Sequence, residues 1–127
     1  MSATSDRRAV LDVVLSQLAA MREGDWETVR ALSARELRER WSAERLAEVA
    51  RAGYAPLLGS VGQRVEQVEI EDDAARCRLT LMRRDGSSLI ARYELRREED
   101  TWRVAGIALG ATLTAVLSMN GGRRRRR

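Results

Sequence analysis

The stretch Ala74–Leu109, AARCRLTLMRRDGSSLIARYELRREEDTWRVAGIAL, contains three segments in which apolar and polar residues alternate. Alternation with a period of two is typical of half-buried strands. Asp85-Gly86 separates the first two segments and favours a tight hairpin turn. Glu98-Glu99-Asp100 separates the second and third. The stretch therefore predicts three antiparallel strands that follow one another along the chain.

The three strands share one predicted apolar face, which must be covered by the rest of the chain. The residues expected on it are Ala75, Cys77, Leu79, Leu81, Leu89, Ala91, Tyr93, Leu95, Trp102, Val104, Gly106 and Ala108. The opposite phase of the last strand places Arg103, Ala105 and Ile107 outward. Residues 61–70 alternate in two different phases, so we predict a fourth strand there with a bulge near Glu66.

The first half of the chain predicts helices. Residues 6–22 carry an apolar stripe with helical spacing, formed by Val10, Val14, Leu18 and Met21. Asp25 is a suitable N-cap for a short helix that continues to about Leu32. A final helix is expected from about Ala43 to Ala52, because Gly53 and Pro56 follow it.

Two serines in this half have the spacing of helix caps. Ser33 is followed by Glu36, which predicts a capping box in which each side chain bonds the other residue's backbone amide. Ser42 precedes the final helix in the same way. The fold class is therefore α+β: N-terminal helices packed on a curved antiparallel sheet of about four strands. We expect residues 1–109 to form a single domain, 110–120 to extend or pack on the sheet, and 121–127 to be a disordered arginine-rich tail.

Composition excludes several functions. All 23 basic residues are arginine, and five of them form the terminal run Arg123–Arg127. The remaining 18 basic residues face 19 acidic ones, so the body of the chain has no basic bias and predicts no specific nucleic-acid partner. Histidine is absent, which removes the commonest general base and metal ligand. We predict no cofactor and no metal. The single cysteine, Cys77, indicates a reducing compartment, and we expect a cytoplasmic protein.

The chain resembles the nuclear transport factor 2-like superfamily of cone-shaped domains, and within it a bacterial family of uncharacterised domains. The residues that carry the resemblance are Gln17-Leu18, Asp25-Trp26, Gly53-Tyr54-Ala-Pro56 and Trp102–Gly106 with Leu109. It covers roughly residues 7–109, and the chain departs from it by lacking phenylalanine. The resemblance implies a cystatin-like cone with a pocket between the concave sheet face and the helices. The superfamily includes isomerases, dehydratases, cyclases and many non-catalytic domains, so the fold does not decide the function.

Catalytic members of the superfamily place a carboxylate or histidine base on the inner sheet face. The predicted inner positions hold no Asp, Glu or His. An enzyme of the isomerase, dehydratase or cyclase type would therefore depend on Asp12 or Glu48 from a helix, and both are otherwise read as solvated helix charges. We predict no catalytic residue, and a non-catalytic binding or interaction module remains the preferred function.

Four residues are candidates for ligand contacts in the predicted pocket: Gln17, Tyr54, Tyr93 and Trp102. Gln17 lies on the apolar stripe of the first helix, where its amide either bonds nearby backbone or orients a ligand. The aromatic residues either pack in the core or contact a small apolar ligand. Both interpretations stay open for each residue.

The outer sheet face carries more apolar residues than an open surface favours, so we predict a homodimer that uses this face. The candidate contacts are Met82, Ile90, Arg92 and Ile107. The arginine tail is either a solvated segment or a weak binder of nucleic acid or acidic membrane. The apolar run before it, residues 110–119, is too short to cross a membrane, so no transmembrane span is expected.

Overall fold

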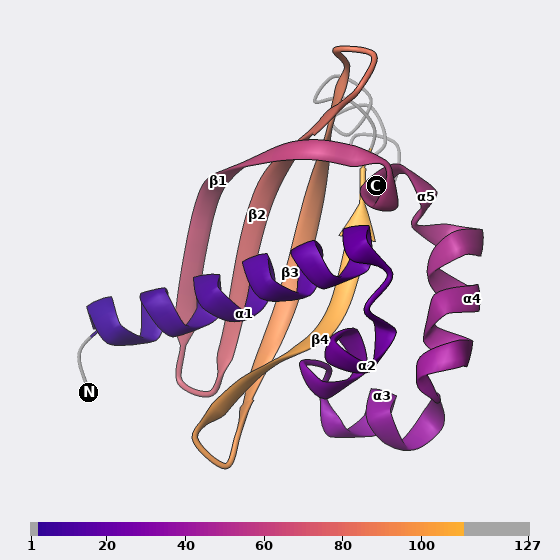
Figure 1. Cartoon of the computed structure of the whole chain (residues 1–127). Coiled ribbons are helices and arrows are strands. Elements are labelled where there is room, and N and C mark those ends of the chain that lie inside the picture. The colour runs from indigo at the N-terminus through magenta and orange to yellow at the C-terminus, as the bar shows by residue number, and fades with distance from the viewer. Residues whose placement is uncertain (1–2, 111–127) are drawn as a thin grey trace, which may run out of the picture.

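The computed structural model describes residues 3–110. Five helices precede four strands: α1 (Ala3–Glu23), α2 (Trp26–Ala31), α3 (Arg35–Arg40), α4 (Ala43–Gly53) and α5 (Ala55–Leu58), then β1 (Ser60–Glu71), β2 (Ala74–Arg83), β3 (Ser88–Glu98) and β4 (Thr101–Leu109). The strands form one antiparallel sheet in the order β1-β2-β3-β4. Figure 1 shows a curved sheet with α1 lying across its concave face and α2, α3 and α4 beside β4. The predicted α+β fold class is confirmed.

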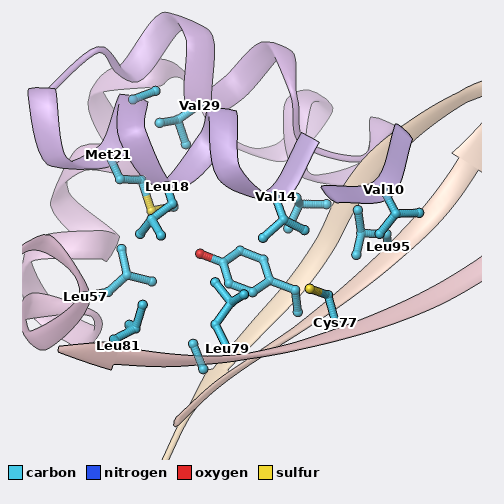
Figure 2. Close-up of a cluster of buried hydrophobic side chains, with 14 of the residues drawn as sticks. Val10, Val14, Leu18, Met21, Val29, Leu57, Cys77, Leu79, Leu81 and Leu95 are labelled. Carbon is cyan, nitrogen blue, oxygen red and sulfur yellow. The ribbon is translucent and has the colours of Figure 1, made fainter. Parts of the chain in front are cut away.

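The core lies between α1 and the inner face of the sheet (Figure 2). Val10, Val14 and Leu18 supply the helix side of this core, and all three are buried. Leu79, Leu81 and Leu95 supply the sheet side, together with Leu57 from α5. Helical spacing places the apolar residues of α1 on one stripe, and alternation places those of the strands on one face. The stripe packs on that face.

Turns in the strand region follow the sequence signals. Gly86 has a φ of 91° in the β2–β3 turn, a conformation that favours glycine. Glu99 and Asp100 form the β3–β4 turn with φ values of 50° and 66° although neither is glycine. The helix caps are mixed: Asp25 accepts a hydrogen bond from Thr28 N and Ser42 from Arg45 N, as predicted. Ser33 does not cap α3, whose N-cap is Ala34.

Register shifts set the phase of the edge strands. The β1–β2 register shifts between Val65 and Gln67, which leaves Glu66 as the extra residue and confirms the predicted bulge. The β3–β4 register also shifts, because Glu94 pairs with Gly106 while Leu95 pairs with Val104. One extra residue in β4 reverses the facing of every later side chain in the strand.

The end of the chain is described only in part. The backbone amide of Gly110 donates to the carbonyl of Ile90 at 2.8 Å, so strand pairing continues one residue beyond β4. The rest of the predicted extension 110–120 and the predicted tail 121–127 lie outside the described residues. Within residues 3–110, none of the helices is long and apolar enough to span a membrane.

Candidate functional site

A mostly apolar cavity of about 250 Å³ lies between the helices and strand β4. Three polar side chains line it: Gln17 from α1, Ser33 from the segment between α2 and α3, and Tyr54 from the junction of α4 and α5. The other lining residues are Met21, Trp26, Val29, Leu37, Trp41, Leu46, Val49, Ala50, Val104, Ala105, Gly106 and Ile107. We call it the β4 cavity. Its volume is slightly below the roughly 300–1,000 Å³ of drug-sized ligand sites, so it suits a smaller molecule.

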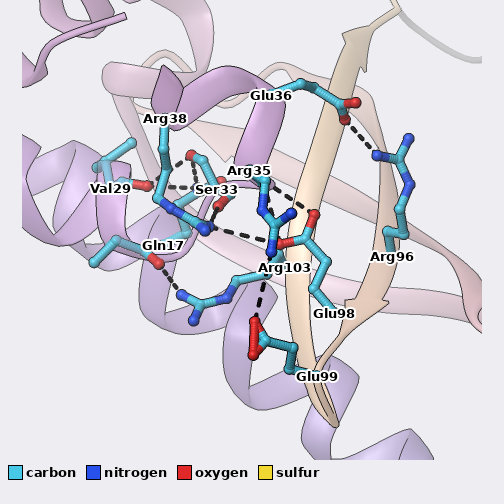
Figure 3. Close-up of polar contacts among 11 residues, drawn as sticks. Gln17, Val29, Ser33, Arg35, Glu36, Arg38, Arg96, Glu98, Glu99 and Arg103 are labelled. Atoms are coloured by element: carbon cyan, nitrogen blue, oxygen red, sulfur yellow. Dashed lines mark hydrogen bonds and ion pairs between the residues drawn. The ribbon is translucent and has the colours of Figure 1, made fainter. Parts of the chain in front are cut away.

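Gln17 lies at the buried end of the β4 cavity, with only 1% of its surface exposed. Its Nε2 donates to the carbonyl of Val29 at 3.1 Å and to Oγ of Ser33 at 3.2 Å (Figure 3). The Val29 carbonyl can only accept, so it fixes which end of the amide faces it. The amide oxygen Oε1 is buried and has no hydrogen-bond partner among residues 3–110.

Ser33 connects the helices to β4. Its hydroxyl donates to the carbonyl of Val29 at 2.8 Å. Its backbone forms a parallel bridge with Val104, where the amide of Ala34 donates to the Val104 carbonyl at 2.8 Å. The predicted capping box at Ser33 is wrong because this hydroxyl is used inside the fold. The amide of Arg35 at the start of α3 donates instead to the carboxylate of Glu98, at 3.0 and 3.2 Å.

Tyr54 lies at the half-exposed rim of the cavity. Its hydroxyl donates to the carbonyl of Ile107 at 2.7 Å, which joins the α4–α5 junction to β4. Ile107 pairs with Tyr93, whose side chain is in the core, so Ile107 faces inward. The prediction that Ile107 lies on the outer face is wrong, and the β4 bulge is the physical reason.

Tyr93 and Trp102 lie away from this cavity. Tyr93 is buried in the core and its hydroxyl has no partner within the described chain. Burial raises the pKa of this phenol well above its usual range. Trp102 is also buried, and the guanidinium of Arg97 lies 4.9 Å from its ring centroid. Arg97 in turn contacts Asp6 of α1 at 3.1 Å, so Trp102 and Arg97 lie where α1 meets the sheet.

The two carboxylates proposed as bases for an enzyme do not reach the cavity. Asp12 is exposed on α1. Glu48 is exposed on α4 and accepts a hydrogen bond from Arg45 at 2.8 Å. The part of the chain that the structure describes contains no group of His, Cys, Asp and Glu residues that could hold a metal ion. Burial raises the pKa of the Cys77 thiol to about 11, so it is protonated at neutral pH.

The outer sheet face carries a groove of about 350 Å³ with charged walls. Arg78 and Arg92 face each other across β2 and β3, and Arg76 pairs with Glu94 in the same way. Among the described residues, Met82 and Val61 are the exposed large apolar side chains, at 41% and 54%. Met82, Ile90 and Arg92 therefore remain candidates for an interface on this face, and Ile107 does not.

A family model matches residues 3–115, which is most of the chain. The chain belongs to the family described as a domain of unknown function (DUF4864). The described helices and strands all lie within the matched range. No curated protein matches the chain.

Several solved structures are similar to the chain in fold. An NTF2-like protein of unknown function from Shewanella oneidensis is 14% identical, with a TM-score of 0.59 over 82% of this chain and 98% of that one. A provisionally assigned dehydratase of the NTF2-like family from Streptomyces avermitilis is 14% identical, with a TM-score of 0.62 over 88% and 99%. An NTF2-like protein with a cystatin-like fold from Novosphingobium aromaticivorans is 16% identical, with a TM-score of 0.57 over 90% and 88%. The DUF4864 chain therefore has the NTF2-like, cystatin-like fold.

Of the four residues predicted from the sequence to line a pocket, Gln17 and Tyr54 line the β4 cavity. Ser33 was not among the predicted pocket residues. Its Ser-x-x-Glu context indicates a local helix cap, and its tertiary contact with Gln17 has no sequence signature. Trp26 and Trp41 also line the cavity, both at intermediate exposure.

Proposed function

We propose that this DUF4864 domain binds a small, mostly apolar molecule in the β4 cavity and does not transform it. The single observation that carries the proposal is the amide oxygen of Gln17, which is buried at the cavity and unpartnered within residues 3–110. An unsatisfied buried acceptor costs about 1–3 kcal/mol, so its retention at a cavity wall favours a role in holding a ligand.

The rim supports the same proposal. Trp26, Trp41 and Tyr54 line the cavity with part of their surface exposed, while Gln17 and Ser33 are buried. Aromatic walls with a few fixed polar groups at depth are the usual composition of a small-molecule site. The hydroxyl of Tyr54 is held by the Ile107 carbonyl, which fixes its position at the rim.

Binding without chemistry is favoured over an isomerase, dehydratase or cyclase because of the lining. Proton abstraction needs a group of suitable pKa within hydrogen-bond reach of the ligand. The lining contains Gln, Ser and Tyr as its polar side chains and no carboxylate. Asp12 and Glu48, the alternative bases, are both exposed on the outer sides of their helices.

A blocking variant tests the proposal. Val49 of α4 lines the cavity at intermediate exposure, so Val49→Trp places a ring in it. Ala52→Trp is the matched control, because Ala52 is exposed on the same helix and does not line the cavity. Calorimetric titrations with three bicyclic probes, indole, benzofuran and indole-3-carboxylate, should show binding of at least one to the unaltered chain and to the control. Loss of that binding in Val49→Trp is expected. Absence of binding by every probe, or equal binding by the blocked variant, would refute the proposal.

A second candidate function is self-association through the outer sheet face. Its support is the exposed apolar surface of Met82 near Ile90, on a face that also carries arginine and glutamate side chains. Apolar side chains exposed on a sheet favour a partner surface. An isologous contact between two copies would place arginines of one against glutamates of the other.

A further inference from the structure

Three polar side chains of the β4 cavity, those of Gln17, Ser33 and Tyr54, have committed their hydrogens to other protein groups. The two Nε2 hydrogens of Gln17 are used by the Val29 carbonyl and by Oγ of Ser33. The hydroxyl of Ser33 donates to the same carbonyl, and the hydroxyl of Tyr54 donates to the carbonyl of Ile107. What these three side chains still offer a ligand is therefore oxygen lone pairs alone.

We propose that the β4 cavity selects a neutral, largely apolar ligand that carries an N–H or O–H donor, which it gives to Oε1 of Gln17. This inference rests on the proposed function and specifies its ligand. A ligand that only accepts hydrogen bonds would leave Oε1 unsatisfied in an apolar site. Rejection of a molecule that lacks the required hydrogen-bonding group is the strongest discrimination a small pocket can make.

The charges around the cavity argue for a neutral ligand. Arg38 donates to the carbonyl of Ser33 at 2.5 Å, and Arg30 donates to the carbonyl of Trp41 at 2.9 Å. These guanidinium groups adjoin two lining residues from outside, and no acidic residue lines the cavity. An organic cation would therefore find no carboxylate partner in the cavity. An anion would be drawn to the arginines but would meet the oxygen lone pairs of Gln17, Ser33 and Tyr54 at the buried end, at the full cost of its desolvation.

Size limits the ligand further. A cavity of about 250 Å³ has the room of roughly eight water molecules at about 30 Å³ each. A bicyclic aromatic fits this space and can lie against Trp26 and Trp41 at the rim. The probes that distinguish the hydrogen-bonding classes are therefore bicyclic and of matched shape: indole has a ring N–H donor, benzofuran has a ring oxygen acceptor in its place, and indole-3-carboxylate adds an anion.

The test compares the dissociation constants of these three probes for the unaltered chain by calorimetric titration. Indole should bind about tenfold or more tightly than benzofuran, because one buried hydrogen bond is gained with the first and one acceptor is left unpaired with the second. Indole-3-carboxylate should bind more weakly than indole. In Gln17→Met, which has an apolar side chain of similar length, indole and benzofuran should bind equally.

The outcomes separate this inference from the function on which it rests. If no probe binds at the cavity, the proposed function fails. If benzofuran or the carboxylate binds as tightly as indole to the unaltered chain, and Val49→Trp blocks it, the cavity is a ligand site and the donor selectivity is wrong. The order of the three dissociation constants for the unaltered chain tests the donor selectivity even if Gln17→Met does not fold.

Discussion

The side-chain amide of Gln17 on α1 donates to the hydroxyl of Ser33, 3.2 Å away, and both groups also bond the carbonyl of Val29. These bonds join the first helix to the segment that pairs with β4. They also fix the orientation of the amide, whose oxygen has no hydrogen-bond partner among residues 3–110. The fold thus holds one acceptor in a fixed direction at the buried end of an apolar space.

Substitution of Gln17 by methionine separates a structural role from a ligand role. Two hydrogen bonds worth about 1 kcal/mol each are lost, while removal of an unpartnered buried acceptor recovers about 1–3 kcal/mol. We therefore expect the free energy of unfolding without ligand to change by less than about 1 kcal/mol in Gln17→Met. Urea denaturation measures it, with Ser16→Ala on the exposed side of α1 as control. A loss of about 3 kcal/mol or more would show that the amide is there for stability alone.

The β3–β4 turn contains a site for stabilisation. Asp100 has a φ of 66°, in the left-handed region that glycine adopts without strain. Asp100→Gly should raise the free energy of unfolding by about 0.5–1 kcal/mol. Thr101→Gly, in the neighbouring extended position, should lower it instead. If both substitutions lower the free energy of unfolding, the described turn geometry is contradicted.

Alkaline pH should destabilise the fold through Cys77. Burial raises the pKa of this thiol from an ordinary value of 9.0 to about 11, so the folded state favours the protonated form. This contribution is complete below pH 9.0 and is lost as the pH rises towards about 11. The free energy of unfolding should fall by at most about 1.4 kcal/mol per pH unit in that window.

The control for the thiol is Cys77→Ala, which removes its titration. Its stability should fall less steeply than that of the unaltered chain across the same window. The buried phenol of Tyr93, whose pKa is also raised by burial, leaves a residual decline in both proteins. Identical pH dependence in the two proteins would show that Cys77 is not the group responsible.

If the outer sheet face is a dimer interface, one substitution on it should convert the dimer into a monomer. Light scattering at micromolar concentration should give the mass of a dimer for the unaltered chain and of a monomer for Met82→Glu, since a carboxylate replaces an apolar contact. Glu44→Gln, exposed on α4 and away from the sheet, is the control and should stay dimeric. A monomeric mass for the unaltered chain would refute self-association through the outer sheet face.

The sequence predicted the elements better than it predicted which way one strand faces. The bulge at Glu66 was predictable because Val65 and Val68 show a visible change of phase. The bulge in β4 was not, because Ala105, Gly106, Ile107 and Ala108 are all apolar or small and neither phase is marked by a charge. Side-chain alternation carries information only where the two faces differ in polarity.

The bulge in β4 also accounts for part of the difference between the predicted pocket and the β4 cavity. The predicted pocket residues Tyr93 and Trp102 lie instead in the buried core, together with Val14, Leu18 and Leu79. The β4 cavity forms where α1, α2 and α4 meet residues 104–107 of β4, the part of the strand that contains and follows the bulge. Gln17 was identifiable from its place on an apolar stripe. Its bond to Ser33 depends on packing and has no signal in the sequence.

The most direct test of ligand binding in the β4 cavity is a nitrogen–proton correlation spectrum during titration with indole. The chain contains its own controls. Of its three tryptophans, Trp26 and Trp41 line the cavity and Trp102 does not. Gln63 and Gln67 are exposed on β1, away from Gln17. We predict that the side-chain signals of Gln17, Trp26 and Trp41 shift together with one dissociation constant while those of Trp102, Gln63 and Gln67 stay in place. Uniform small shifts, or shifts confined to the exposed glutamines, would contradict the assignment of the β4 cavity as the binding site.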